Sequence, residues 1–240
     1  MAKDEDIAFA TAVNEYGFYF VPQDYLGREV PDALLAGEVY EPKTIRLIQR
    51  LAGHGDVVTG GAFVGDFLPA LSGALAGGAL LHSFEPNPLS LLACRKTIAA
   101  NRLHNVRLHP VAVGEAAGHL PLQLSSSAGT PMAARAKIAT TAVKGETVDV
   151  PVARLDDLIG ADRRVSVLHL DIEGHEWPAL QGARRIIEAD SPVIILEAAK
   201  RWVRRDYETR LRDSFPACRY LCAGVMERNA FFLPFDGDRG

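Results

Sequence analysis

Residues 56–67, DVVTGGAFVGDF, constrain the fold more than any other part of this 240-residue sequence. The stretch begins with apolar residues typical of a buried strand, and three glycines and one alanine follow between residues 60 and 65. Glycine adopts positive φ and lets another group approach the backbone, and the start of a helix offers free N–H groups. A strand, a glycine turn and a helix in this order predict a Rossmann-like unit. The turn serves either a ligand or the packing of the helix on the strand.

After residue 40, short apolar runs alternate with amphipathic segments, which is the pattern of an α/β sheet. The expected parallel strands are residues 57–61, 79–86, 106–114, 165–174 and 192–198. The expected helices are residues 41–51, 66–75, 89–101, 176–189 and 200–214. Residues 220–225 and 229–235 are expected to close the chain as an antiparallel pair.

Residues 115–165 interrupt this rhythm with alternating segments around a middle rich in Ser, Gly and Ala. We expect an inserted hairpin there, with a mobile loop near residues 125–142. Residues 1–40 are expected to form an N-terminal cap segment, so that residues 1–240 are a single domain. In this segment Tyr16, Phe18 and Phe20 alternate as on a strand, and such an apolar face suits the core or the interface of a homodimer.

The composition excludes several classes of protein. The formal net charge is −4, with 26 basic and 30 acidic side chains, which is no signature of nucleic-acid or membrane-surface binding. Three cysteines are too few for a secreted disulfide framework, and the acidic N-terminus lacks the features of a signal peptide. No apolar run approaches the length of about 20 residues that spans a membrane. We therefore expect a cytoplasmic protein that binds neither nucleic acid nor membrane.

An acidic residue follows the second expected strand, at the place where a nucleotide ribose is held in Rossmann-like folds. Glu85 lies 20 residues after Gly65 and can accept hydrogen bonds from both ribose hydroxyls. The alternative is an exposed carboxylate at a strand end. Together with the glycine turn, Glu85 predicts an adenosine-containing cofactor, either a nicotinamide dinucleotide or S-adenosylmethionine.

Residues 169–177, HLDIEGHEW, supply the candidates for acid–base chemistry. Asp171 and Glu173 alternate with the expected strand, so both are predicted to reach its carboxyl edge on one face. Two neighbouring carboxylates raise each other's pKa, which suits a general base. The alternative is that they cap the helix that begins near Glu176. His169 is expected to be a hydrogen-bonded core residue or a catalytic one, and His175, at the turn, is the better candidate for proton transfer.

Several segments together resemble the FkbM-type methyltransferase family: YEPKTIRLIQRLAGHGDVVTGGAFVGDF, SFEPNP, NVRLHPVAVGE, VPVARLDDLI and LHLDIEGHEWPALQGA. The resemblance covers about residues 38–198, with a weaker echo in NAFFLP at residues 229–234. It implies a class I fold with a mostly parallel central sheet and an antiparallel C-terminal strand. It also implies S-adenosylmethionine as cofactor, S-adenosylhomocysteine as product, and O-methylation of a sugar or another hydroxylated natural product.

The resemblance assigns roles to individual positions. The cofactor-binding residues it implies are Thr59, Gly60, Gly61, Ala62, Gly65, Asp66, Glu85, Pro86, Asn87 and Asp171. Asp171, Glu173, Gly174 and Glu176 match an Asp-x-Glu-Gly-x-Glu segment, and the candidates for the catalytic base are Asp171 and Glu173, with His175 behind them.

Three positions depart from the family pattern. Thr59 stands where aspartate is usual, Phe63 where asparagine is common, and His169 where lysine is frequent. Losing a charge-assisted hydrogen bond at Thr59 would cost about 1.5–3 kcal/mol, which weakens cofactor binding about ten- to hundredfold.

No metal is expected, although Asp171, Glu173 and Glu176 could supply oxygen ligands. The acceptor is expected to be a hydroxylated small molecule. It is a sugar, or an acidic or carrier-bound compound if Lys200, Arg201 or Arg205 receives it. Two other functions stay open. One is a non-catalytic relative that binds the cofactor, and the other is an NAD(P)-dependent dehydrogenase, for which no Tyr-x-x-x-Lys pair is present.

Overall fold

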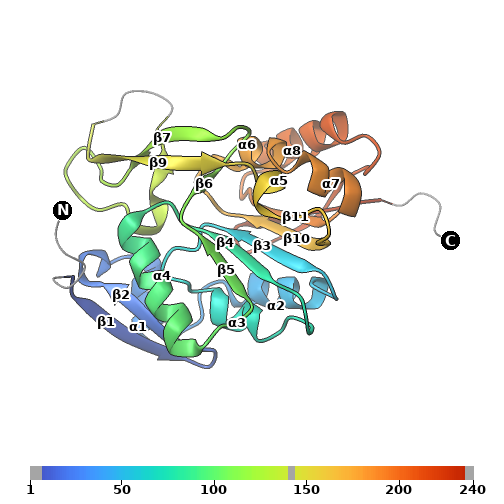
Figure 1. The fold of residues 1–240 in the computed structure, drawn as a ribbon. Helices are drawn as coiled ribbons and strands as arrows, with labels where there is room; N and C mark the ends of the chain where they lie inside the picture. The colour runs from blue at the N-terminus through green and yellow to red at the C-terminus, as the bar shows by residue number, and fades with distance from the viewer. Residues whose placement is uncertain (1–6, 140–143, 236–240) are drawn as a thin grey trace.

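A seven-stranded sheet forms the centre of the computed structural model, which describes residues 7–139 and 144–235 (Figure 1). Across the sheet the strands lie in the order β12-β13-β11-β10-β3-β4-β5. In that order their bounds are Leu221–Met226, Asn229–Leu233, Val193–Glu197, Val165–Leu170, Asp56–Gly60, Leu81–Phe84 and Val106–His109. The strands from β11 to β5 are parallel, and β13 runs antiparallel to both of its neighbours. The mostly parallel sheet with an antiparallel C-terminal strand is confirmed.

Helices cover both faces of this sheet, which explains why its central strands are apolar throughout. On β3, Val57 faces one core and Val58 the other. The core around Val57 includes residues of α2 (Pro42–Leu51), α3 (Leu68–Ser72) and α4 (Pro88–Asn101). The core around Val58 includes residues of α5 (Leu155–Leu158), α6 (Glu176–Gln181), α7 (Arg184–Asp190) and α8 (Arg201–Ser214).

The helices follow the sequence pattern at α2, α4 and α8, and depart from it in two places. The helix expected at residues 66–75 is reduced to α3, because residues 63–67 form a turn. The helix expected at residues 176–189 is divided into α6 and α7 at Gly182, where a Cβ atom would collide with the backbone oxygen of Gly114. No helix in the described part of the chain has the length and apolar character that a bilayer crossing requires.

The insertion is larger than the expected hairpin and forms a second sheet. Its strands lie in the order β6-β9-β7-β8, with bounds Ala112–Val113, Thr147–Ala153, Gly118–Gln123 and Lys137–Ile138. The strand expected at residues 106–114 is thus divided between β5 and β6, with Pro110 between them. The loop expected at residues 125–142 contains the short 3₁₀ helix η3 (Ala133–Arg135), and residues 140–142 of it lie outside the described residues.

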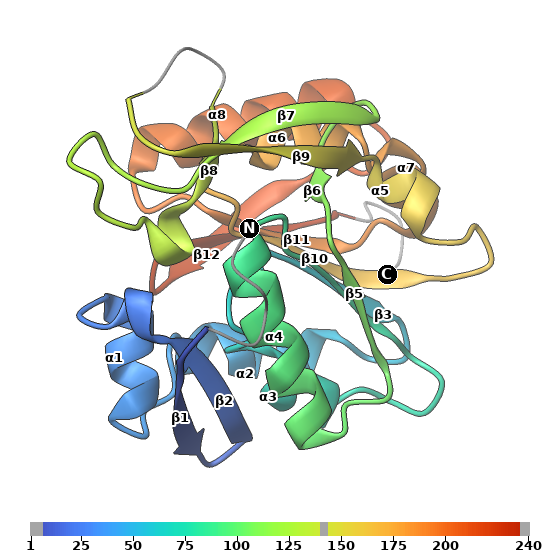
Figure 2. The ribbon, with the colours of Figure 1, turned by 60° about the vertical axis from the view of Figure 1, so that its left-hand side comes forward.

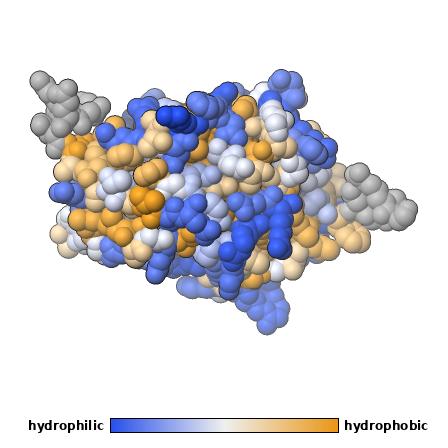
Figure 3. All heavy atoms as spheres, turned by 90° about the horizontal axis from the view of Figure 1, so that it is seen from below, coloured by the Kyte–Doolittle hydropathy of each residue, from blue (hydrophilic) through white to orange (hydrophobic). Residues whose placement is uncertain are grey.

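The N-terminal segment forms the hairpin β1 (Phe9–Asn14) and β2 (Gly17–Pro22), followed by η2 (Gln23–Tyr25) and α1 (Glu29–Leu35). In Figure 2 the hairpin and α1 lie below and the second sheet above. Tyr19 and Val21 form the buried row of β2, so the expectation that Phe18 and its alternating neighbours make the core face is wrong by one residue. Phe18 and its cross-strand partner Val13 are about half exposed, at 50% and 53%. Seen from below, apolar side chains gather on the side where this hairpin lies (Figure 3).

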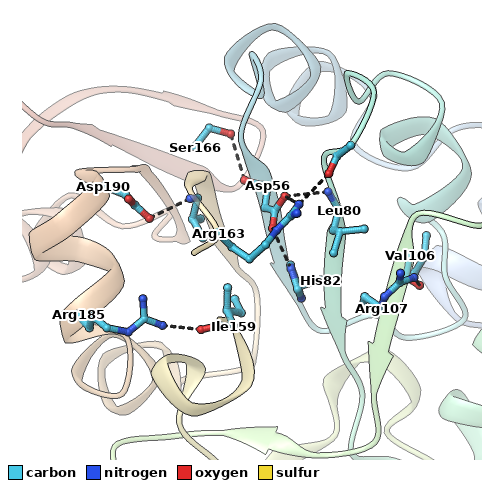
Figure 4. Close-up of polar contacts among 12 residues, drawn as sticks. Asp56, Leu80, His82, Val106, Arg107, Ile159, Arg163, Ser166, Arg185 and Asp190 are labelled. Carbon is cyan, nitrogen blue, oxygen red and sulfur yellow. Dashed lines mark hydrogen bonds and ion pairs between the residues drawn. The ribbon is translucent and has the colours of Figure 1, made fainter. Parts of the chain in front are cut away.

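A buried ionic cluster fixes the amino end of β3. Asp56 accepts hydrogen bonds from the backbone N–H of Leu80 at 2.8 Å, from His82 Nε2 at 3.1 Å and from Arg163 Nε at 2.8 Å (Figure 4). Burial opposes the charge of Asp56, but these donors, led by Arg163, hold its pKa below the usual value. The cluster ties the start of β3 to β4 and to the segment before β10, at the sheet edge opposite the carboxyl ends of the strands.

Candidate cofactor and acceptor site

A cavity of about 340 Å³ lies at the carboxyl ends of the parallel strands. Residues after β3, β4, β10 and β11 line it, together with residues 27–31 at α1 and residues 132–138 around η3 and β8. This is the edge of an open α/β sheet at which ligands bind. The insertion and the N-terminal segment therefore complete a site that begins on the central sheet.

The glycine turn serves close packing within the protein as well as the cavity. Gly61 has φ +83°, and a Cβ atom there would lie less than 3.0 Å from the backbone oxygen of Asp171. Gly65 has φ +86° and packs against Cys94 and Thr97. The packing interpretation is supported by Gly65, which packs against α4, and the ligand interpretation stays a prediction, with Gly61 in the lining of the cavity.

Glu85 holds the glycine turn and the start of α4 with its carboxylate. Its Oε2 accepts a hydrogen bond from the backbone N–H of Phe63 at 2.7 Å, and its Oε1 accepts one from that of Asn87 at 2.8 Å. Burial raises the pKa of Glu85 to about 8, and the two amide donors favour the ionised form against that. Asn87 caps α4 by accepting from the N–H of Leu89. Glu85 and Pro86 line the cavity, whereas Asn87 supports them from behind.

Non-glycine residues with positive φ gather around this cavity. The described residues include eight of them, and Glu41, Phe63, Ala133 and Glu173 line the cavity. Phe63, with φ +47°, stacks on Tyr25 at 5.4 Å between ring centroids. Asparagine tolerates this conformation better than phenylalanine does. Backbone strain of this kind is typical of functional sites.

Thr59 and His169, two of the departures from the family pattern, are partners in one contact. They are paired in register between β3 and β10, and Thr59 Oγ1 lies 3.0 Å from His169 Nδ1. Burial lowers the pKa of His169 to about 4, so the ring is neutral at pH 7. A neutral hydroxyl–imidazole pair thus occupies the two positions.

Asp171 and Glu173 line the cavity, but not as the last residues of a strand. β10 ends at Leu170, and Glu173 has φ +54° in the turn that follows. Burial raises the pKa of Asp171 well above its usual value, and the charges of Glu197 and Glu41 add to the increase. Burial also raises the pKa of Glu173.

Glu176 and His175 have different roles in this turn. Glu176 Oε1 accepts from the N–H groups of Ile172 and Gly174, and Oε2 accepts from the Tyr207 hydroxyl, so Glu176 holds the turn before α6. No side chain in the described part of the chain caps α6, so the alternative that Asp171 and Glu173 cap this helix is wrong. His175 lines the cavity at the N-terminus of α6, and burial lowers its pKa.

Most of the residues implied by the sequence meet at this cavity. Those that line it are Thr59, Gly61, Asp66, Glu85, Pro86, Asp171, Glu173 and His175. Gly60, Ala62, Gly65 and Asn87 do not line it. Lys200, Arg201 and Arg205 do not line it either; its basic side chains are Arg28, Arg135, Lys137 and Arg228.

Sequence reasoning missed seven charged residues of the lining: Arg28, Glu29, Glu41, Arg135, Lys137, Glu197 and Arg228. Glu197 is the last residue of β11, and Glu85 directly follows β4. This strand-end position could have identified Glu197 from the sequence. Seven carboxylates line the cavity against four basic side chains. Burial raises the pKa of five of these carboxylates, and a ligand that carries positive charge would favour their ionised forms. In the described residues no cluster of His, Cys, Asp and Glu has the geometry to hold a metal ion.

The sheet order and the position of the cavity define a class I methyltransferase fold. The chain belongs to the FkbM methyltransferase family, because the model of the methyltransferase FkbM domain matches residues 60–222. This is a family of S-adenosylmethionine-dependent methyltransferases.

Three solved methyltransferase structures are similar to this chain. The methyltransferase FkbM from Methylobacillus flagellatus KT is 20% identical to this chain, with a TM-score of 0.51. The match covers 75% of this chain and 43% of that one, so this chain spans less than half the length of that relative. Precorrin-6y C5,15-methyltransferase from Geobacter metallireducens GS-15 is 14% identical, with a TM-score of 0.44 over 80% of this chain and 84% of the other. An S-adenosylmethionine-dependent methyltransferase from Aquifex aeolicus is 10% identical, with a TM-score of 0.47 over 82% and 91%. Comparison with curated proteins gives no match.

Proposed function

We propose that the protein transfers a methyl group from S-adenosylmethionine to a hydroxyl group of a sugar or another small natural product. The observation that carries the proposal is the acidic cavity at the carboxyl ends of β3, β4 and β10, with Glu85 and Gly61 at one side of it. S-Adenosylmethionine carries a sulfonium and an ammonium group, and both suit such a cavity.

The residues present fit this cofactor. Glu85 would accept the ribose hydroxyls, because each carboxylate oxygen has a further lone pair beside its bond to a backbone amide. Asp66, Thr59 and Asp171 would hold the methionine end. Apolar lining residues would enclose the adenine: Phe84, Pro86, Val111, Ala112 and Val113. When bound, S-adenosylmethionine supplies an electrophilic methyl group.

The protein's own contribution would be to align the acceptor and to take its proton. Alignment of two reactants is worth up to about 7–11 kcal/mol in favourable cases, and a positioned base adds about 10²- to 10⁴-fold. Asp171, Glu173 and His175 line the cavity and are the candidates for this base that the sequence offers.

The acceptor side of the cavity supports a polar, hydroxylated compound. Glu173 and Glu197 can accept hydrogen bonds from hydroxyl groups, and Arg28 and Lys137 could receive an acidic group of the acceptor. We also propose that the protein forms a homodimer in which the exposed Val13 and Phe18 lie at the interface. We propose no nucleic acid and no membrane as partner.

The experiment is calorimetric titration of the purified protein with S-adenosylmethionine, S-adenosylhomocysteine and NAD in parallel. We expect micromolar binding of the first two and none of NAD, because the diphosphate of NAD would meet an excess of carboxylates. Binding should be followed by methyl transfer, unchanged by a chelator, to a mixture of methyl glycosides and sugar phosphates. Absence of binding of both S-adenosylmethionine and S-adenosylhomocysteine would refute the proposal. Binding without methyl transfer to any acceptor would favour a non-catalytic relative.

A further inference from the structure

The N-terminus of α2 places a carboxylate in the cavity that the sequence did not indicate. Glu41 immediately precedes Pro42, lines the cavity and is only 8% exposed. Its backbone is left-handed, with φ +46° and ψ +54°. A glutamate in this conformation costs free energy, and such residues persist where the surrounding structure requires them.

The side chain of Glu41 does not serve the helix that it precedes. A residue at this position normally accepts hydrogen bonds from the first N–H groups of the helix. Here Glu227, from the turn between β12 and β13, does so instead, accepting from the N–H of Lys43 at 3.1 Å and from that of Thr44 at 2.9 Å. Glu227 also accepts from the Thr44 hydroxyl at 2.7 Å. The Glu41 carboxylate is thereby free to face the cavity.

A buried asparagine fixes one oxygen of this carboxylate. Asn229, the first residue of β13 and fully buried, donates from Nδ2 to Glu41 Oε2 at 2.7 Å. No hydrogen bond within the described residues reaches Glu41 Oε1. One oxygen is thus held by the core while the other stays available to a ligand.

We propose that Glu41 is the base that takes the proton of the acceptor hydroxyl, with Asn229 as its positioning residue. The inference rests on the proposed function. The O–H bond of the acceptor breaks and its proton goes to Glu41 Oε1. The electron pair left on oxygen forms the new bond to the methyl carbon, and the bond from that carbon to sulfur breaks with its electron pair on sulfur.

The electrostatic surroundings suit this role. Burial raises the pKa of Glu41 to about 7, which is near the optimum for a base at neutral pH. The hydrogen bond from Asn229 and the charge of Arg228 lower the pKa of Glu41, whereas Glu227 and Glu197 raise it. Asp171 and Asp66 also face this carboxylate, because the charge of Glu41 raises the pKa of each.

Asp171 is less well suited to be the base. Its carboxylate accepts no hydrogen bond within the described residues, and burial raises its pKa well above the usual value. No donor in the described part of the chain favours its ionised form, whereas Asn229 donates to Glu41. Asp171 then lines the reacting centre without taking the proton.

The first test needs no acceptor. In full-length protein labelled with ¹³C at the glutamate carboxyl carbons, one signal should titrate near pH 7 and should vanish in Glu41→Gln. In Asn229→Ala the same signal should titrate at higher pH, because the donor that favours the ionised form is lost. Titration of the Glu41 signal below pH 5 would overturn the base, and no shift in Asn229→Ala would overturn the positioning role.

The second test separates this inference from the proposed function. With labelled S-adenosylmethionine and a mixture of methyl glycosides, Glu41→Gln should lower turnover about 10²- to 10⁴-fold and abolish the loss of rate below pH 7. Its affinity for S-adenosylhomocysteine should stay unchanged. Glu227→Gln, the matched control at the same helix end, should keep the rate at neutral pH and move its loss to lower pH, because a charge that raises the pKa of Glu41 is removed. Normal turnover in Glu41→Gln would overturn the inference alone. Absence of methyl transfer by the unmodified protein would refute the proposed function. In that case the ¹³C titration would still test the pKa of Glu41.

Discussion

The contact between the glycine turn and the segment after β10 can be tested at a single atom. In Gly61→Ala, the new Cβ would lie less than 3.0 Å from the backbone oxygen of Asp171, on a residue with φ +83°. Gly78→Ala is the matched control, because Gly78 has φ +87° and nothing within 4 Å of its Cβ position. The two variants share the conformational cost, and only Gly61→Ala adds the collision.

The magnitudes follow from these two terms. A left-handed conformation costs an L-residue about 1–2 kcal/mol, and the gain from a less flexible unfolded chain is the same in both variants. Forcing extra volume against packed atoms costs about 1–3 kcal/mol more. We therefore expect Gly61→Ala to be less stable than Gly78→Ala by about 1–3 kcal/mol, with about 2–4 °C of Tm for each kcal/mol in a domain of this size.

Urea denaturation of the two variants beside the unmodified protein measures this difference directly. Calorimetry with S-adenosylhomocysteine adds a second readout, because displacing Asp171 from the turn should weaken binding in Gly61→Ala and not in Gly78→Ala. Equal stability of the two variants would refute the reasoning that Gly61 is required by the Asp171 backbone.

Three further predictions concern other buried polar groups. Glu85→Ala leaves two buried backbone amides without an acceptor, so affinity for S-adenosylhomocysteine should fall at least about tenfold by calorimetry; unchanged affinity would contradict its role. Thr59→Asp places a charge beside a neutral imidazole and should lower the free energy of unfolding. Adding His169→Lys should recover about 1–3 kcal/mol of that free energy in a double-mutant cycle. Additive effects of the two substitutions would show that the positions are not coupled. Asp56→Asn should cost about 3 kcal/mol in urea denaturation at pH 7 without changing cofactor affinity. Because the folded pKa of Asp56 is lowered, its stabilisation is present above the unfolded pKa and is lost as pH falls through the folded one; an equal acid sensitivity of the variant would argue against this.

Local patterns predicted the elements that depend on local interactions. Pro42, Ile45 and Ile48 indicated α2, and the structure has it with both isoleucines buried. The end of β10 could not be predicted in this way. The alternating pattern continues to Glu173, but the strand ends at Leu170. There the backbone of Asp171 packs against Gly61 of the glycine turn, 110 residues earlier in the chain.

The same limit applies to the site. Glu85 and Asp171 could be identified because each follows a strand that the pattern located. Glu41 reads in the sequence as the residue that caps α2, and only the position of Glu227, 186 residues later, shows that the cap is supplied from elsewhere. The pairing of Thr59 with His169 likewise needs the register of β3 and β10.

The two ends of the central strand β3 have different roles, and the ionic cluster around Asp56 anchors one of them. At the amino end, Arg163 and His82 join three segments of chain through one carboxylate. At the carboxyl end, four residues away, the same strand turns into the cavity. Asp56, His82 and Arg163 do not line the cavity. Under the proposed function, the residues of α1, η3 and the strand ends that line the acceptor side can therefore change for a different substrate while this cluster stays intact. A change of specificity in this protein is therefore best sought by mutating Arg28, Lys137 or Glu197, and library designs should leave the opposite edge of the sheet untouched.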